Sequence, residues 1–332
     1  MTDHQPPLVG YHCSHEQFAP SRLLALARLA EQAGFGGALS SDHLHPWSER
    51  QGESGFAWSF LGAALASTGL SFGVVNAPGQ RYHPAIVAQA AATLAEMFPD
   101  RFWLAVGSGQ HVNESVTGER WPAKEERNAR LRECVDVMRA LWAGETVTHR
   151  GHVTVENARV WSRPARPPLL VGAAVTAPTA EWAAGWADAL ITVSRPPDEL
   201  RTVVDAWRRG GGEGKPMFLK VQLSYGATDA AAREGAHEQW RNNVFPNDTL
   251  TTLRTVKEFD GMGQFVTPDQ LDPFVRISAD PARHVAWLRA DLELGFSRLY
   301  LHNVNREQER FVEGFGERVL PALADLLPER AA

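Results

Sequence analysis

Short apolar runs alternate with amphipathic stretches along most of the chain. Each run is apolar at successive positions, as in a strand buried on both faces of a parallel sheet, and each following stretch repeats apolar residues at helical spacing. This alternation of strand and helix predicts an α/β fold with a parallel sheet. The predicted strands span residues 7–13, 36–39, 70–76, 102–107, 169–172, 190–193, 218–225 and 296–303.

The stretches between the predicted strands carry the usual signals for helix ends. Ser21 and Gly34 bracket one amphipathic segment as N-cap and C-cap, and Pro84 opens another at its first turn. The predicted helices span residues 21–34, 56–67, 84–97 and 124–142, with a C-terminal helix at 307–327.

Two segments depart from this alternation. Residues 147–160 look like an extended excursion with a turn at Arg150-Gly151, which we expect to lie over the barrel. Residues 242–275 mix polar, glycine and proline positions. We interpret them as an insertion between the seventh and eighth strands that folds over the active face.

Eight strand-helix units predict a (β/α)8 TIM barrel, and we expect residues 1–332 to form it as one domain. Barrels of this kind keep their chemistry at the carboxyl ends of the strands. The sequence agrees, because histidines, carboxylates and amides follow several of the predicted strands. They lie at 11–16 after the first strand, 42–43 after the second, 76 after the third, 108–114 after the fourth and 302–305 after the eighth.

Composition narrows the function classes. Of the 332 residues, 44% are apolar and 22% charged, as in soluble globular proteins, and no apolar run reaches the roughly 20 residues that cross a bilayer. The net charge of −6 disfavours nucleic acid as a general partner. The N-terminal residues show no export signal, so we expect a cytoplasmic protein. Cys13 and Cys134 are too few for a disulfide framework, and no His-Glu-x-x-His spacing typical of a zinc site is present.

The segment around Asp42 and His43 is the main candidate for chemistry. A histidine just beyond a barrel strand suits a general acid or base, because its ordinary pKa lies near about 6.5. The alternative is a structural histidine capped by the neighbouring carboxylate. Trp47 follows in the same loop, where it would wall one face of a flat ring or simply cover the barrel mouth.

A second candidate is the glycine-rich run 107–114 after the fourth strand. Its backbone amides would cradle a phosphate or bind a ring, or would merely form a tight turn. The run lacks the dinucleotide G-x-G-x-x-G fingerprint, so a Rossmann site is not predicted there. Cys13 ends the first strand without an obvious base partner, and we interpret it as a packing residue.

At these residues the chain resembles the luciferase-like flavin and deazaflavin oxidoreductases, most closely the coenzyme F420-dependent glucose-6-phosphate dehydrogenase group. The matching motifs lie at residues 10–20, 41–47, 81–89, 107–114 and 127–133. The resemblance spans Gly10 to about Leu326 and implies a TIM barrel and a homodimer.

The resemblance also implies roles for individual residues. His43 corresponds to the base that takes the substrate proton, and Glu16 and Trp47 correspond to its hydrogen-bonding partner and the wall of the active site. A non-prolyl cis peptide bond is implied at Val74-Val75, behind the cofactor ring. The implied cofactor contacts are Asp42, Val74, Val75, Ser108, Gly109 and Asn113.

Several positions depart from the pattern of that group. Gln110 stands where the group has a proton-relay glutamate, and an amide cannot shuttle a proton at neutral pH. Ala174-Val175 replace the paired glycines of the cofactor-phosphate loop, and Ala77 replaces a threonine contact. Val193 and Pro196 replace the threonine and lysine that would hold a sugar phosphate, which makes glucose 6-phosphate an unexpected substrate.

These departures are similar to a branch of the group that uses FMN. We therefore expect an FMN-dependent oxidoreductase or monooxygenase that performs hydride transfer or oxygenation on a small organic substrate at the carboxyl face. One alternative is a coenzyme F420-dependent sugar or alcohol dehydrogenase. The other is a barrel that binds a flavin or metabolite without turning it over, as a broken acid-base pair would suggest.

Overall fold

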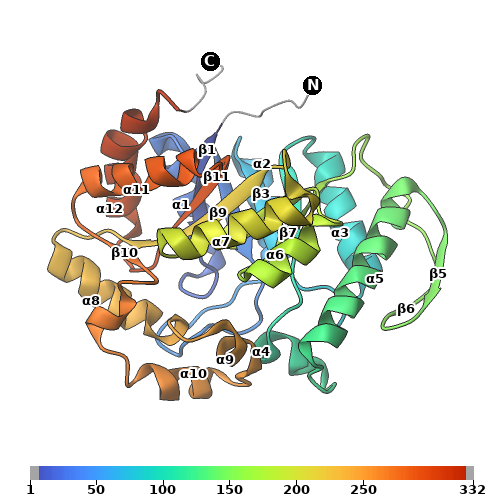
Figure 1. The fold of residues 1–332 in the computed structure, drawn as a ribbon. Helices are drawn as coiled ribbons and strands as arrows, with labels where there is room; N and C mark the ends of the chain where they lie inside the picture. Colours follow the sequence, from blue (N-terminus) through green and yellow to red (C-terminus); the bar gives the residue numbers. More distant parts are fainter. Residues whose placement is uncertain (1–6, 327–332) are drawn as a thin grey trace.

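A closed barrel of parallel strands forms the centre of the molecule. The computed structural model describes residues 7–326, and its strands follow one another around the barrel with the last pairing to close the ring. The predicted (β/α)8 TIM barrel is therefore confirmed (Figure 1). The barrel strands are β1 Leu8–Cys13, β2 Gly37–Ser41, β3 Ser71–Asn76, β4 Phe102–Val106, β7 Leu169–Ala173, β8 Ala189–Val193, β9 Met217–Ser224 and β11 Arg298–Asn303.

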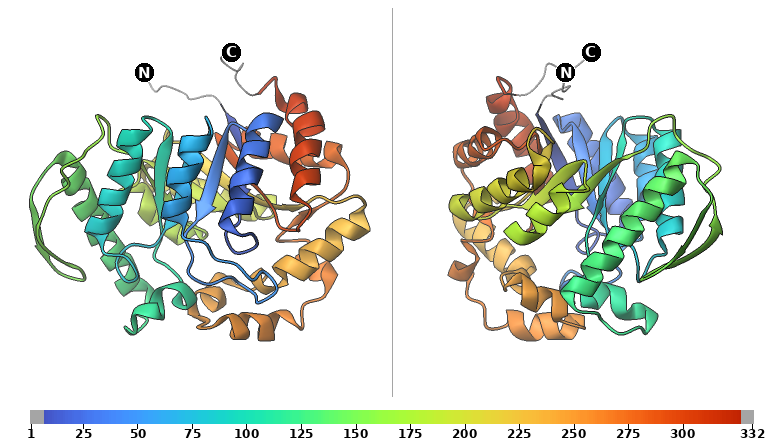
Figure 2. Two further views of the ribbon diagram at one scale, coloured as in Figure 1. Left: turned by 180° about the vertical axis from the view of Figure 1, so that it is seen from behind. Right: turned by 45° about the vertical axis from the view of Figure 1, so that its right-hand side comes forward.

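Helices surround the barrel on its outside (Figure 2). The first of them begins at Pro20, one residue before the expected N-cap Ser21, because proline is pre-shaped for the first helical position. The surrounding helices are α1 Pro20–Ala33, α2 Ala57–Ser67, α3 Pro84–Met97, α5 Lys124–Ala143, α6 Ala177–Ala184, α7 Pro197–Trp207, α11 Pro281–Glu293 and α12 Gln308–Gly314.

The C-terminal helix is shorter than predicted. After α12 the chain passes through a π-helical turn at Phe315–Val319 and a 3₁₀ turn at Pro321–Leu323. Proline at 321 cannot continue the hydrogen-bond ladder of an α-helix. The predicted end at Leu327 lies outside the described residues. None of the described helices is long and apolar enough to cross a membrane.

The expected position of the excursion at 147–160 is wrong. Strands β5 Val147–Arg150 and β6 Thr154–Ala158 form an antiparallel hairpin, which lies outside the barrel beside α5 rather than over it (Figure 1). Glu133 of α5 holds it there, because its carboxylate accepts hydrogen bonds from His149 Nε2 at 2.8 Å and from the backbone of Val153 at 3.2 Å.

The insertion between the seventh and eighth strands is confirmed, and it covers the carboxyl face (Figure 1). It packs there because apolar residues of the insertion meet Trp47 from the loop after β2. Between β9 and α11 the chain forms α8 Asp229–Trp240, η3 Arg241–Asn243, α9 Asn247–Thr252, α10 Val256–Gly263, η4 Pro268–Leu271 and the short strand β10 Arg276–Ile277.

Aromatic side chains plug the lower part of the barrel interior. Trp103 lies 5.0 Å from Phe218 and 5.4 Å from Tyr300 between ring centroids. Gly73 is paired with Trp103 across β3 and β4, and a Cβ atom at position 73 would lie 2.0 Å from the indole. Glycine is thus required at position 73 for the indole to fill the barrel.

We expect Gly73→Ala to lower the free energy of unfolding by about 1–3 kcal/mol, because the added methyl group overpacks the plug. Urea denaturation measures the change. Gly62→Ala in α2 is the matched control, since a Cβ atom at position 62 meets no other atom within 4 Å. That variant should be more stable by roughly 0.5–1 kcal/mol. Equal stability of the two variants would contradict the role of the glycine.

Candidate active site

A buried carboxylate and a histidine face each other across the ends of β1 and β2. His43 Nδ1 hydrogen-bonds Glu16 Oε1, and Ser14 Oγ donates to Glu16 Oε2 at 3.0 Å. Burial alone would raise the pKa of Glu16, but the hydrogen bond from His43 and the nearby charges of His43 and Lys220 hold that pKa well below its usual range. Glu16 is therefore an ionised acceptor.

This pairing fixes the tautomer of His43. Because an ionised carboxylate can only accept, His43 Nδ1 must carry the hydrogen in the bond to Glu16. The neutral ring then has its lone pair on Nε2, which makes no hydrogen bond within the part of the chain that the structure describes. His43 is thus arranged as a base, with Glu16 ready to stabilise its protonated form.

Trp47 closes one side of the histidine. Its ring lies edge-on to His43, with centroids 4.8 Å apart, and contacts Phe259 of α10 at 5.3 Å. Only 6% of Trp47 is exposed. The indole therefore joins the loop after β2 to the insertion above it, and its role as the wall of an active site stays a prediction.

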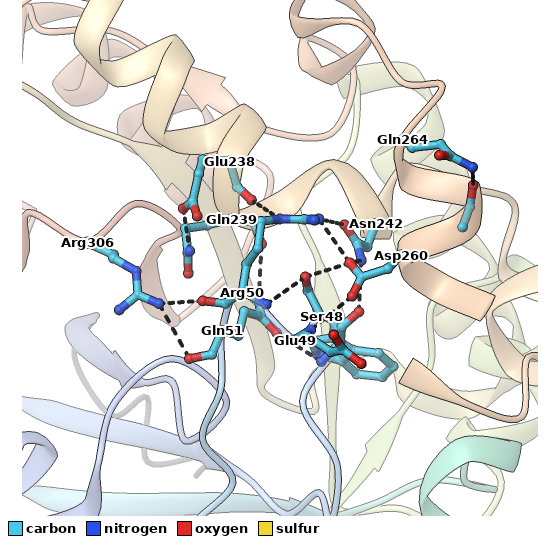
Figure 3. A network of polar contacts seen from close by, with 12 residues as sticks. Ser48, Glu49, Arg50, Gln51, Glu238, Gln239, Asn242, Asp260, Gln264 and Arg306 are labelled. Carbon is cyan, nitrogen blue, oxygen red and sulfur yellow. Dashed lines mark hydrogen bonds and ion pairs between the residues drawn. The ribbon is translucent and has the colours of Figure 1, made fainter. Parts of the chain in front are cut away.

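Polar contacts lock the same loop to the insertion (Figure 3). Asp260 of α10 accepts from Ser48 Oγ at 2.6 Å and from the backbone of Glu49 at 2.9 Å. Arg50 reaches Asp260 at 3.0 Å and Asn242 Oδ1 at 3.0 Å. Asn242 Nδ2 in turn donates to the backbone oxygen of Trp47 at 2.9 Å. The insertion is thus a lid fastened to the loop that carries His43 and Trp47.

Asp42 is held by protein groups on every side. Its carboxylate accepts hydrogen bonds from Asn76 Nδ2 at 2.8 Å, Trp58 Nε1 at 3.1 Å and Tyr82 OH at 3.1 Å. Arg81 lies 3.5 Å from the same carboxylate. Asp42 therefore ties the loops after β2 and β3 together, and the cofactor contact implied for it stays a prediction.

Arg81 also bridges to a second buried carboxylate, Glu114. The guanidinium lies 3.6 Å from Glu114 Oε1, and the backbone of Arg81 donates to Oε2 at 3.2 Å. Burial outweighs this contact and raises the pKa of Glu114 to about 7. Glu114 ends the glycine-rich run at 107–114, but its raised pKa could not be predicted from the sequence. It is buried only because α4 His111–Glu114 packs against the barrel.

The expected cofactor contacts after β4 are adjacent to each other. Gly109 has a positive φ of 78°, and a Cβ atom there would lie 2.7 Å from Glu114. Ser108 Oγ accepts from Lys124 Nζ at 2.7 Å, which leaves its hydroxyl hydrogen for another partner. Gln110 forms the N-cap position of α4, and its amide makes no hydrogen bond within the described residues. Ala77 lies close to Gly109.

Two buried amides keep free polar atoms that suit a ring cofactor. Asn113 Oδ1 accepts from the backbones of Leu44 and His45, while its Nδ2 has no partner in the described part of the chain. Asn76 donates to Asp42, while its Oδ1 has none. One free donor and one free acceptor match the alternating polar edge of a flavin or deazaflavin ring.

Val74 and Val75 point in opposite directions. Val75 packs with the residues inside the barrel, whereas Val74 packs in the core between barrel and helices. Any contact from Val74 to a ligand in the barrel must therefore come from its backbone. The described residues contain no cis peptide bond. The cis bond expected at Val74-Val75 is absent, and β3 keeps regular parallel register there.

Ala174 and Val175 lie where the cofactor-phosphate loop was expected. They connect β7 to α6, whose N-cap Thr176 makes no side-chain cap. The backbone amides at the start of such a helix suit a phosphate. Val193 ends β8 and Pro196 caps α7, so neither offers a donor to a sugar phosphate.

Three basic residues inside the barrel were missed as site residues. His12 of β1 and His302 of β11 are each 1% exposed, with ring centroids 4.4 Å apart, and Lys220 of β9 lies beside them. One signal was available in the sequence, because Lys220 is the only charged residue between Met217 and Tyr225. Cys13, by contrast, packs in the core, and burial raises the pKa of its thiol.

Comparison with known proteins places the chain in a family. A family model described as luciferase-like monooxygenase matches residues 4–298. The F420-dependent glucose-6-phosphate dehydrogenase of Beutenbergia cavernae is 36% identical over 331 residues, covering 95% of this chain and 97% of the relative. The protein of the same name from Nakamurella multipartita is 35% identical over 340 residues, covering 97% and 98%.

A solved structure is similar over the same length. An F420-dependent secondary alcohol dehydrogenase in complex with an F420-acetone adduct superposes with a TM-score of 0.89 at 28% identity, over 97% of this chain and 100% of that chain. These relatives are named for coenzyme F420, which was the second of the two expected cofactors.

Glu114 should make stability depend on pH. Its folded-state pKa of about 7 lies above the ordinary value of 4.5, so between these values the folded chain keeps a proton that the unfolded chain has released. The contribution of protonated Glu114 to the free energy of unfolding is complete below its ordinary pKa. It is lost as pH rises through its folded-state pKa, by no more than about 1.4 kcal/mol per pH unit.

Glu114→Gln removes this titration. Relative to the wild type, the variant should therefore gain stability between about pH 5 and about pH 8 in urea denaturation. A difference between the two proteins that does not change with pH would contradict the assigned pKa.

Proposed function

The chain belongs to the luciferase-like monooxygenase family, and from this premise we propose that it is an oxidoreductase that uses coenzyme F420 to dehydrogenate a small alcohol. The observation that carries the proposal is the buried Glu16–His43 pair, with Nε2 of the histidine left as a base. Dehydrogenation of an alcohol needs such a base for the hydroxyl proton. The two curated relatives and the similar alcohol dehydrogenase support the deazaflavin over FMN.

The residues at the barrel mouth fit such a cofactor. The free Nδ2 of Asn113 and the free Oδ1 of Asn76 would bind the polar edge of its ring. The hydroxyl of Ser108 and the backbone at Gly109 would add contacts from the loop after β4. Backbone amides at Val175 and the start of α6 would hold a phosphate of its side chain.

The chain's own residues perform the proton chemistry. When bound, the deazaflavin supplies the acceptor for the hydride from the alcohol carbon. His43 Nε2 takes the hydroxyl proton, and the imidazolium that forms is stabilised by Glu16 through Nδ1. Trp47 and the lid above it exclude water from the reacting centre. Gln110 would donate a hydrogen bond to the ring, but it cannot supply a proton.

Glucose 6-phosphate is not the substrate that these residues suit. Val193 and Pro196 offer neither charge nor donor at the end of β8. The threonine and the lysine that the resemblance would place there for a sugar phosphate are missing, so the phosphate loses two of its expected donors.

Gln110 favours a second candidate function, an FMN-dependent oxidoreductase. An amide is sufficient beside a reduced flavin, because donors alone stabilise its negative charge. On this reading His43 and Trp47 would contact the substrate in the same way.

Titration of the purified protein with coenzyme F420 and with FMN tests the cofactor directly. We expect a saturable change in the absorbance of the deazaflavin, and alcohol-dependent loss of its oxidised spectrum. His43→Ala should lower turnover by about 10²–10⁴-fold and leave cofactor affinity nearly intact, because the imidazole acts on substrate. Full activity in His43→Ala, or binding of FMN alone, would overturn the proposal.

Gln110→Glu separates the two cofactors. In a deazaflavin alcohol dehydrogenase the new carboxyl group restores an acid beside the ring, so turnover should rise, by up to about 10²–10⁴-fold. In an FMN enzyme it places an anion beside the reduced flavin and turnover should fall through Coulomb repulsion. Gln110→Asn is the control that keeps an amide and adds no charge.

A further inference from the structure

Lys220 is a cation inside the barrel that makes no ion pair with the described residues. Phe218, Lys220 and Gln222 lie two residues apart on β9 and therefore share one side of the strand. Because Phe218 packs in the aromatic plug, Lys220 also faces the barrel interior. Its ammonium lies 5.6 Å from the centroid of Trp240. No hydrogen bond or ion pair joins it to any residue that the structure describes. Burial lowers the pKa of Lys220 to about 8, although Glu16 opposes the shift.

The histidines beside Lys220 have ring nitrogens without a hydrogen-bond partner in the described structure. Both ring nitrogens of His12 are buried without a hydrogen bond in the described structure. His302 donates from Nε2 to Gln17 Oε1 at 3.1 Å, which leaves its Nδ1 unpaired. Burial and the charge of Lys220 lower the pKa of both histidines well below the usual value. Leaving a buried polar group unpaired costs about 1–3 kcal/mol, so these three unpaired ring nitrogens in one place indicate a missing ligand.

Glu16 is the nearest carboxylate, but it does not pair with Lys220 or with the two histidines. Glu16 is already bound by His43 and Ser14. Arg195 is a second cation near Lys220. It follows the end of β8 two residues after Val193, and Val193 pairs with Lys220 of β9. Arg195 lies over the ring of Phe274 at 5.7 Å and makes no ion pair within the described residues. The β8–β9 side of the barrel therefore carries positive charge that the chain itself does not neutralise.

We propose that Lys220 and His12 bind a carboxylate group of the substrate, which makes the substrate a small hydroxy acid. One ammonium and one imidazole N–H match the two oxygens of a carboxylate, whereas a phosphate dianion would bring a second negative charge close to Glu16. The aromatic plug below limits the depth of the subsite, and Glu16 lies close to both Lys220 and His43. The proposal rests on the proposed function for the identity of the reacting alcohol, but not for the binding of the acid.

Binding without turnover is the first test. Isobutyrate and its amide, which have no alcohol to oxidise, are titrated into the purified protein by calorimetry. Isobutyrate should bind and the amide should not. Lys220→Met should weaken binding of isobutyrate by about tenfold or more, the effect of losing a charged hydrogen bond. Lys257→Met, which removes an exposed lysine of α10, is the control and should bind isobutyrate as the wild type does.

Turnover with 2-hydroxyacids and their amides is the second test. In the wild type with coenzyme F420, the acid should have the higher kcat/KM, and Lys220→Met should lower the ratio of acid to amide by about tenfold or more, mainly through KM. If Lys220 only keeps Glu16 ionised, both substrates will lose kcat equally and the ratio will not change, which overturns the proposal.

The outcomes separate the two proposals. Isobutyrate that binds no better than its amide, or equally well to Lys220→Met, overturns the carboxylate subsite whatever cofactor is used. Absence of turnover with coenzyme F420 overturns the proposed function, while the calorimetry still decides the subsite. If Lys220→Met does not fold, the wild-type preference for acid over amide still decides.

Discussion

The pairing of β8 with β9 is the constraint on which the rest of the structure depends. It closes the parallel ladder into a ring, so every inward side chain must share one narrow interior. Trp103, Phe218 and Tyr300 fill the lower half, and Gly73 makes room for the indole. The upper part of the interior holds polar side chains, among them His12, Lys220 and His302.

Buried charges in that upper half are arranged in two separate networks. Asp42 and Glu114 share Arg81, which holds the loops after β2, β3 and β4 in place. Glu16 serves His43 instead and leaves one ring nitrogen free for chemistry. The half-buried Lys220 belongs to neither network, because none of the described residues forms a hydrogen bond or an ion pair with it. It therefore points to a ligand that the chain does not itself provide.

The insertion between the seventh and eighth strands covers the loop that carries His43. Asp260 collects donors from three successive residues of the loop after β2, while Trp47 contacts Phe259 of the same helix. This arrangement makes the position of His43 depend on a segment more than 200 residues away in the chain, since Ser48 and Asp260 are separated by 212 positions. The same contacts therefore hold the loop after β2 in place and hold the insertion over it.

The sequence by itself determined the barrel, the insertion between the seventh and eighth strands, and the gathering of Glu16, His43, Asn76 and Gln110 at one face. These follow from apolar periodicity and from the order of strand ends, both of which are local properties. It did not place the hairpin β5–β6, which a single carboxylate on α5 anchors outside the barrel.

Only the tertiary structure decided which side chains face one another. The bond of His43 to Glu16, the shared Arg81 and the isolation of Lys220 depend on strand register and on helices packed over the rim. Residues such as Val74 and Val75 are neighbours in the chain yet face opposite sides of the barrel wall. The physical reason is that burial and pairing, which set the pKa of each group, are properties of the closed barrel and not of any one segment.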